Sequence, residues 1–496
     1  MRQRGLTLLI VGIGMLLMLT SSELLRTDTG TALAGLFMFV VAALPGWLWL
    51  VRGMPHLPLW EVYAGAHLVY YWLPSSGEDS VMLDESPEVR ATCLLAVGLF
   101  LLAGWLGQIV VLLWAREIRQ TAWSLGNVAV TDEQHVGWAW WALWVCAFYS
   151  AATHYGLMWR ILPPTLQPYV AATIRVSGTL GVFFLGLRLG RVGFQPVLRL
   201  AYAGGVVGYC IFETVGGMLG SSVMMCGSAM AAYIMGARRL PFVTLTVGLA
   251  LVTFFNMGKK EWRAQYMNTY DSLSVTERVG AWVKFSWEAL EAHLAGERDE
   301  QVQTALERTD LTKVLVRVVG TTPREVPFWE GQTYADGLQL MVPRFINPNR
   351  PELNAVMREV GIIYGFHINY EMSQGTNISI GPIAEAWMNR SWVLLGLVGT
   401  CYGLFFAAGT VIAQDRQPEQ VGFLVGMSFF SFFGPALELL SMSLLMTVLQ
   451  GMGITVGVLF ALAAFQNWVR SAPAITAPVL PGSLARLQAG QESQLD

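Results

Sequence analysis

Residues 91–114 read ATCLLAVGLFLLAGWLGQIVVLLW, a run that contains no Asp, Glu, Lys or Arg. At a helical rise of about 1.5 Å per residue this run is about 36 Å long, enough to cross the roughly 30 Å hydrocarbon core of a bilayer. The whole chain has this character, because 54% of its 496 residues are hydrophobic and only 13% are charged. Soluble domains carry about 25% charged residues, so we expect lipid to surround most of this chain.

Apolar runs of this kind recur along the chain and predict about 12 transmembrane helices. They cover residues 5–22, 32–51, 58–74, 91–114, 138–156, 169–188, 197–218, 222–236, 241–257, 391–413, 420–440 and 443–468. The run after Arg2 and Arg4 resembles a secretory signal, but no small-residue cleavage site follows it, so we expect a retained helix. The predicted fold class is an all-α polytopic membrane protein.

The arginines predict the orientation of these spans. If Met1 is cytoplasmic, the cytoplasmic side would hold Arg2, Arg4, Arg52, Arg116, Arg119, Arg188, Arg191, Arg199, Arg238, Arg239, Arg416 and Arg470. The short outer loops would hold only Arg26, Arg90 and Arg160. This distribution follows the positive-inside rule and predicts that both chain ends are cytoplasmic.

The same path divides the chain into four parts. They are nine spans (1–257), a large non-cytoplasmic segment (258–390), three spans (391–468) and a Pro-, Ala- and Gln-rich tail that we expect to be disordered (469–496).

The segment 258–390 is too long for a structureless loop. Apolar side chains at helical spacing in 275–294 and 297–319 predict helices, so we expect a helical cap over the membrane mouth. The aromatic residues Trp282, Phe285 and Trp287 are also typical of a position among lipid headgroups.

Cysteine and histidine give no sign of a metal site. All five cysteines lie in apolar runs, and the six histidines are scattered without a metal-ligand spacing. We therefore predict no disulfide framework, no metal and no cofactor.

Two ionisable residues lie inside predicted spans, where charge is costly and commonly functional. Arg175 lies in 169–188 and Glu213 in 197–218, each near the outer end of its span. A hairpin would bring them to similar depth. One interpretation is a structural ion pair between neighbouring helices, and the other is an outward-facing cavity in which Arg175 binds an anion.

The segment 258–390 adds cations at the same level. Lys259 and Arg263 follow the ninth span directly, on the side that positive charge usually avoids. Arg344 follows Pro343, and Arg350 precedes Pro351, so prolines restrict both arginines. Guanidinium groups match phosphate oxygens, and these residues are therefore candidates for binding a phosphorylated ligand.

Three residues are candidate proton acceptors. Glu385 follows Gly381-Pro382, a pair typical of a helix start, where an acidic side chain can also simply complement the helix dipole. His367 lies shortly before this helix, and Glu213 lies inside its span. The sequence alone does not rank the three.

Four stretches together resemble a known family. They are Gly258–Arg263 (GKKEWR), Pro327–Tyr334 (PFWEGQTY), Val342–Pro351 (VPRFINPNRP) and Gly381–Trp387 (GPIAEAW). Their order is similar to that in bacterial oligosaccharide repeat-unit polymerases of the Wzy type, in the superfamily of O-antigen ligases. The specific part of the likeness covers residues 258–399. Arg350-Pro351 replaces the family's usual Lys-Pro, and Glu385-Ala386-Trp387 replaces its Glu-x-Tyr.

The resemblance implies a GT-C-like, metal-independent glycosyltransferase. Such an enzyme works at the periplasmic side of the bacterial inner membrane and joins repeat units carried on undecaprenyl pyrophosphate, which are both donor and acceptor. A flippase and a chain-length regulator are the implied protein partners, and no nucleic acid is. Arg175, Lys259, Arg263, Arg344 and Arg350 would then stabilise the departing pyrophosphate, and Glu385, His367 or Glu213 would accept the proton.

Other functions remain as alternatives. A ligase that moves finished glycan onto lipid A or a protein differs from a polymerase only in its acceptor. A transporter or flippase would show internal repeats and midplane charge, and neither is evident. Transferases that use single-sugar lipid carriers usually have an acidic first outer loop, whereas residues 21–31 here contain only Glu23 and Asp28.

Overall fold

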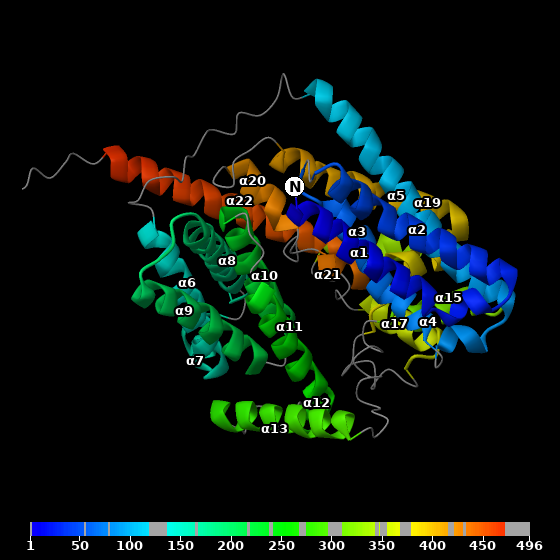
Figure 1. Ribbon diagram of the computed structural model, residues 1–496, viewed down its shortest axis with the longest axis horizontal. Coiled ribbons are helices and arrows are strands. Elements are labelled where there is room, and N and C mark those ends of the chain that lie inside the picture. The colour runs from blue at the N-terminus through cyan, green and yellow to red at the C-terminus, as the bar shows by residue number, and fades with distance from the viewer. Residues whose placement is uncertain are drawn as a thin grey trace, which may run out of the picture. The chain divides into compact units, whose positions relative to one another are not determined.

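The computed structural model describes residues 2–53, 56–77, 80–118, 136–163, 167–215, 219–237, 242–266, 274–295, 310–342, 347, 355–367, 378–414, 421–429 and 433–471. Every regular element in these ranges is a helix, which confirms the predicted all-α class (Figure 1). The chain divides into two compact units, Met1–Thr455 and Val456–Asp496.

Among the residues that the structure describes, five helices are long and apolar enough to cross a membrane. Their spanning parts are Thr29–Val51, Pro87–Ala115, Tyr169–Arg191, Gly381–Ala413 and Ser441–Ala461. Shorter apolar helices cover Leu8–Thr20, Ser221–Ala237 and Thr246–Met257. These helices are compatible with a chain embedded in a membrane, whereas the count of 12 spans and the side that each loop faces stay predictions.

The first group of helices is built around α5 (Pro87–Ile118) and α19 (Gly381–Ala413), which pack along each other. The helix α2 (Thr29–Val51) lies beside α5 (Figure 1). The other members are α1 (Arg2–Thr20), η1 (Glu23–Arg26), α3 (Leu59–His67), η2 (Leu68–Trp72), α4 (Leu73–Ser76), η3 (Val81–Asp84), α15 (Thr312–Thr321), α16 (Gln332–Met341), α17 (Ala355–Ile363), α20 (Val421–Ser428), α21 (Phe433–Glu438) and α22 (Ser441–Ser471). One buried cluster joins most of them, and Trp60, Trp72, Phe100 and Phe406 are among its fully buried residues.

Glycines set the close approach of α5 and α19. A Cβ atom at Gly104 would lie 2.8 Å from the carbonyl oxygen of Gly399, and one at Gly107 would lie 2.9 Å from that of Thr400. A Cβ atom at Gly403 would meet the carbonyl oxygen of Gly104. Small residues at such contacts let two backbones touch, which is the usual source of helix association in a bilayer.

A second group has its own core. It consists of α6 (Val136–His154), α7 (Leu157–Ile161), α8 (Gln167–Arg191), α9 (Pro196–Val215) and α10 (Leu219–Ala237). Leu143, Val182 and Tyr209 are buried in it. The helices α8 and α10 also meet through glycines, since a Cβ atom at Gly186 would lie 2.9 Å from the carbonyl oxygen of Ala229.

The start of the predicted cap is helical. The helix α11 (Phe242–Met257) is followed by α12 (Lys259–Tyr266) and by α13 (Val275–Leu294), which covers the predicted helix 275–294 (Figure 1). Trp262 stacks on Trp282 with ring centroids 5.0 Å apart, and both are buried. Trp287 is 54% exposed and therefore still fits a position among lipid headgroups. Trp282 is buried and does not fit such a position.

Several predicted boundaries differ from those observed. The segment 58–74 is not one regular helix but α3, the π-turn η2 and α4. The segment 420–440 contains α20 and the separate α21. By contrast, the predicted span 391–413 begins at the kink of α19, where the non-helical Arg390 and Ser391 separate residues 381–389 from the rest of the helix. Most of the predicted tail, from residue 472, lies outside the described residues.

Candidate functional site

Glu385 lies in the first turns of α19 and is fully buried. Its Oε1 atom accepts a hydrogen bond of 3.0 Å from the hydroxyl of Thr333, and its Oε2 atom accepts one of 2.6 Å from the backbone N–H of Ser441. Ser441 is the first residue of α22, so the carboxylate serves an N–H group that the helix itself cannot pair. A negative charge is also favoured at this end of a helix.

The kink in α19 makes a docking place for the segment 327–331. Arg390 (φ −164°, ψ 34°) and Ser391 (φ 52°, ψ −134°) leave helical geometry. The carbonyl oxygens just before the kink accept hydrogen bonds from this segment. The N–H of Trp329 donates to the carbonyl oxygen of Met388 at 3.0 Å, and the N–H of Glu330 donates to that of Asn389 at 3.1 Å. Backbone groups freed by a helix distortion are thereby satisfied.

Asn389 ties the same pieces together through its side chain. Its amide nitrogen donates to the hydroxyl of Thr333 at 2.8 Å and to the carbonyl oxygen of Glu385 at 2.8 Å. Its amide oxygen accepts from the N–H of Gly331 at 3.0 Å. Asn389 is itself fully buried. The stretches Pro327–Tyr334 and Gly381–Trp387, both part of the family resemblance, therefore meet in one hydrogen-bonded network.

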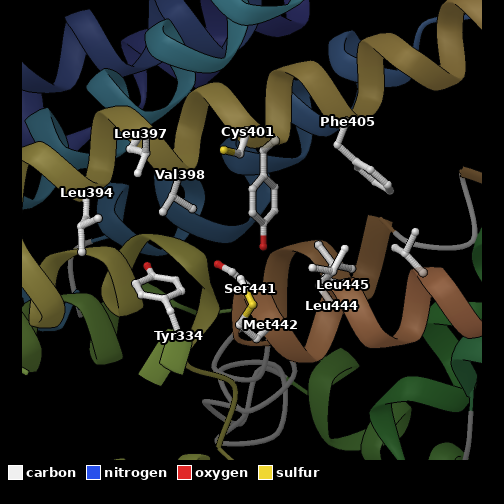
Figure 2. A pocket seen from close by; sticks show the side chains of 12 residues that line it. Tyr334, Leu394, Leu397, Val398, Cys401, Phe405, Ser441, Met442, Leu444 and Leu445 are labelled. Carbon is white, nitrogen blue, oxygen red and sulfur yellow. The ribbon is translucent and has the colours of Figure 1, made fainter. Parts of the chain in front are cut away.

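An apolar cavity of about 470 Å³ borders this network. Figure 2 shows Leu394, Val398 and Phe405 of α19 on one wall and Leu444 and Leu445 of α22 on the other. Its size and lining are typical of a site for a small apolar ligand or for part of a lipid chain.

Three hydroxyl groups lie among these apolar side chains. They belong to Tyr334 of α16, Tyr402 of α19 and Ser441 of α22, and their oxygen atoms are buried. Burial raises the pKa of Tyr334, and the neighbouring carboxylate of Glu385 raises it further. Tyr334 therefore stays protonated and can donate a hydrogen bond to a ligand in the cavity.

Arg175 and Glu213 form an ion pair, with 3.3 Å between the Nη2 and Oε1 atoms. Glu213 is buried and also accepts a hydrogen bond of 3.0 Å from the hydroxyl of Ser150. The Arg175 side chain is 49% exposed. The contact is the one expected of a structural pair between α8 and α9, and the exposed part of Arg175 is still accessible to an anion.

The other candidates are distributed as follows. His367 follows α17, and its Nε2 atom is buried without a hydrogen-bond partner among the described residues. The ammonium of Lys259 is close enough to Glu438 for their charges to interact. Arg263 lies in α12, but its side chain is outside the described part of the structure. Arg344 and Arg350 lie entirely outside the described residues. The described residues hold no group of three His, Cys, Asp or Glu side chains that could bind a metal.

Sequence reasoning missed several residues of this network. Thr333 and Asn389 lie within the two matched stretches or directly after them, and the resemblance could have pointed to both. Tyr402 lies in the predicted span 391–413 and Ser441 lies between two predicted spans, and neither carries a local signal.

Comparison of the chain with protein-family models, with curated proteins and with solved structures gives no match.

Proposed function

We propose that this protein is a glycosyltransferase that joins undecaprenyl-pyrophosphate-linked oligosaccharide repeat units at the periplasmic side of the bacterial inner membrane. One observation carries the proposal: the stretches that resemble the polymerase family meet at the buried Glu385, beside an apolar cavity bounded by two helices long enough to span a membrane.

The cavity suits the lipid part of such a substrate. Its walls between α19 and α22 are aliphatic and aromatic, and burial of an isoprenoid chain against them is favourable by about 25 cal/mol per Å² of apolar surface. The hydroxyls of Tyr334, Tyr402 and Ser441 supply the few polar contacts that would fix the position of the chain's polar end.

The cations would act on the leaving group. When an acceptor hydroxyl attacks the sugar carbon C1, the bond from C1 to the pyrophosphate oxygen breaks and negative charge grows on the pyrophosphate. Arg175, Lys259 and Arg263 are helix-borne cations that can stabilise this charge, and Arg344 and Arg350 would join them. Arg175 would have to share its guanidinium between Glu213 and the phosphate.

Glu385 is better suited to positioning than to proton transfer. Both carboxylate oxygens already accept hydrogen bonds from the protein, and the side chain has no exposed surface. We assign it the role of holding α16, α19 and α22 in register around the cavity.

Deletion of the gene, followed by complementation, tests the proposal. Cells that lack the protein should keep single lipid-linked repeat units and lose the polymer ladder on a gel, and the wild-type gene should restore the ladder. A ladder that persists in the deleted strain would rule out the polymerase. Loss of polymer transfer to its final acceptor, with lipid-linked polymer retained, would indicate a ligase instead.

A further inference from the structure

Glu438 is a carboxylate that neither the sequence patterns nor the network around Glu385 accounts for. It is the last residue of α21, three positions before Ser441, and it is partly exposed. Its Oε1 atom accepts a hydrogen bond of 3.3 Å from the phenol of Tyr70, and its Oε2 atom accepts one of 3.5 Å from the hydroxyl of Ser379.

The surrounding backbone is built to hold this group near the start of α19. Gly381 has φ +73°, and a Cβ atom there would lie 2.7 Å from the carbonyl oxygen of Leu437 and 3.5 Å from the phenol oxygen of Tyr71. Tyr70 and Tyr71 both belong to the π-turn η2, a wide turn that is frequent at functional sites. Two consecutive phenols therefore reach the same junction between α19 and α21.

Lys259, at the start of α12, carries a positive charge that interacts with the carboxylate of Glu438. In the predicted membrane path, Tyr70, Lys259 and Glu438 lie near the outer ends of three different spans, and Ser379 lies in the outer segment. The cluster thus combines a carboxylate, two hydroxyls and an ammonium on the side where the proposed reaction would occur.

The two glutamates differ in how firmly the protein holds them. Hydroxyl donors usually lie about 2.7–2.8 Å from their acceptors, so the contacts of Glu438 at 3.3 and 3.5 Å are long. Glu385 accepts bonds of 2.6 and 3.0 Å and is fully buried. A hydroxyl of a ligand can therefore compete for Glu438 far more easily than for Glu385.

We infer that Glu438 is the catalytic base of the proposed polymerase, and that Tyr70 and Ser379 help it to bind the acceptor sugar. The inference rests on the proposed function. The acceptor oxygen forms a bond to C1 of the donor sugar, its proton passes to the carboxylate of Glu438, and the pyrophosphate leaves with the electrons of the broken C1–O bond. Lys259, whose charge interacts with Glu438, would stabilise that leaving charge.

The test uses the purified full chain in proteoliposomes. A preformed lipid-linked polymer is extended by single lipid-linked repeat units, whose concentration is varied to obtain kcat and the KM for the acceptor. Glu438→Gln should lower kcat by about 100-fold or more, as expected for loss of a general base. Glu438→Asp should recover part of the rate, and Tyr70→Phe should mainly raise the KM. Glu288→Gln on the exposed part of α13 is the matched control and should behave as the wild type.

Thermal unfolding of the same samples separates chemistry from folding. Glu438→Gln should melt close to the wild type, because it loses only long contacts. The inference is overturned if folded Glu438→Gln extends chains at the wild-type rate, or if Glu438→Asp and Glu438→Gln lose activity only in proportion to lost folded protein. In both cases an active wild type would leave the proposed function intact. A wild type that extends no chains at all would overturn both proposals.

Discussion

The Oε2 atom of Glu385 lies 2.6 Å from the backbone nitrogen of Ser441, so a side chain of α19 caps the first turn of α22. The same carboxylate holds Thr333, next to the start of α16. One buried carboxyl group therefore connects three helices whose residues are more than fifty positions apart in the sequence, and these helices line the apolar cavity.

Removing this carboxylate should destabilise the protein. Glu385→Ala leaves the N–H of Ser441 buried without an acceptor, and a lost cap plus an unpaired group costs about 2–4 kcal/mol. Glu385→Gln keeps one carbonyl acceptor and should cost less. In detergent, the melting temperature should decrease from the wild type to Glu385→Gln and further to Glu385→Ala. Equal melting of all three proteins would show that the cap contributes nothing.

The packing of α5 against α19 predicts opposite effects for two glycines on one helix. A Cβ atom at Gly403 would meet the backbone of Gly104, whereas one at Gly396 finds open space. Gly403→Ala should therefore cost about 1–3 kcal/mol through overpacking. Gly396→Ala should be neutral, or more stable by about 0.5–1 kcal/mol through helix propensity. The melting temperatures of the two variants check this directly. Similar values would contradict the close contact between α5 and α19 at Gly403.

Variants of the Arg175–Glu213 ion pair can separate a structural role of Arg175 from a role in binding pyrophosphate. If the pair is only structural, Arg175→Gln combined with Glu213→Gln should recover both stability and chain extension relative to the single variants. If Arg175 also binds pyrophosphate, as proposed, the double variant should regain stability but stay inactive, with single repeat units accumulating. Gel analysis of lipid-linked glycans alongside a melting curve distinguishes these results.

The N-cap of α2 predicts a dependence on pH. Asp28 accepts bonds from the N–H and hydroxyl of Thr31 and faces Arg90, and these contacts lower the pKa of Asp28 below its ordinary value of 3.8. A lowered folded pKa means that the stabilisation is fully present above the unfolded value and is lost as pH falls through the folded one. Asp28→Ala should thus melt below the wild type at neutral pH, and the difference should shrink below pH of about 4. A constant difference down to pH 3 would contradict a role for the charge.

Hydropathy predicted the long helices well, because burial in lipid acts on each residue independently of its partners. The run 91–114 lies within α5, and 32–51 lies within α2. It placed the start of a span at residue 391, where the non-helical Arg390 and Ser391 interrupt α19. In the structure, the backbone distortion at Arg390 is accommodated by hydrogen bonds from Trp329 and Glu330.

The candidate site was only partly predictable for a related reason. Glu385 was recognisable from the Gly-Pro helix start before it. Thr333 and Asn389 are hydrogen-bonded across 56 positions, so only the family resemblance, and no spacing of residues along the chain, could have pointed to them. Glu438 was not predicted because it lies in the apolar stretch 420–440, which hydropathy predicts to be a single span. In the structure, α20 ends at Ser428 and α21 begins at Phe433.

The orientation of the chain can be checked by labelling single cysteines in a background without the five native ones. Residues near Arg298 and Gly331 should react with a membrane-impermeant reagent in intact cells, and residues near Arg238 and Gln417 should not. Labelling near Arg238 would contradict the predicted path and remove the periplasmic assignment of the site.

The central claim is that this chain polymerises lipid-linked repeat units, and the purified protein in proteoliposomes tests it most directly. Given only undecaprenyl-pyrophosphate-linked repeat units, the wild type should convert them into a ladder of longer glycans on a gel. Arg344→Ala should leave single units, and Arg344→Lys should be impaired because an ammonium cannot reproduce the guanidinium fork. Single units that persist unchanged with folded wild-type protein would contradict the account.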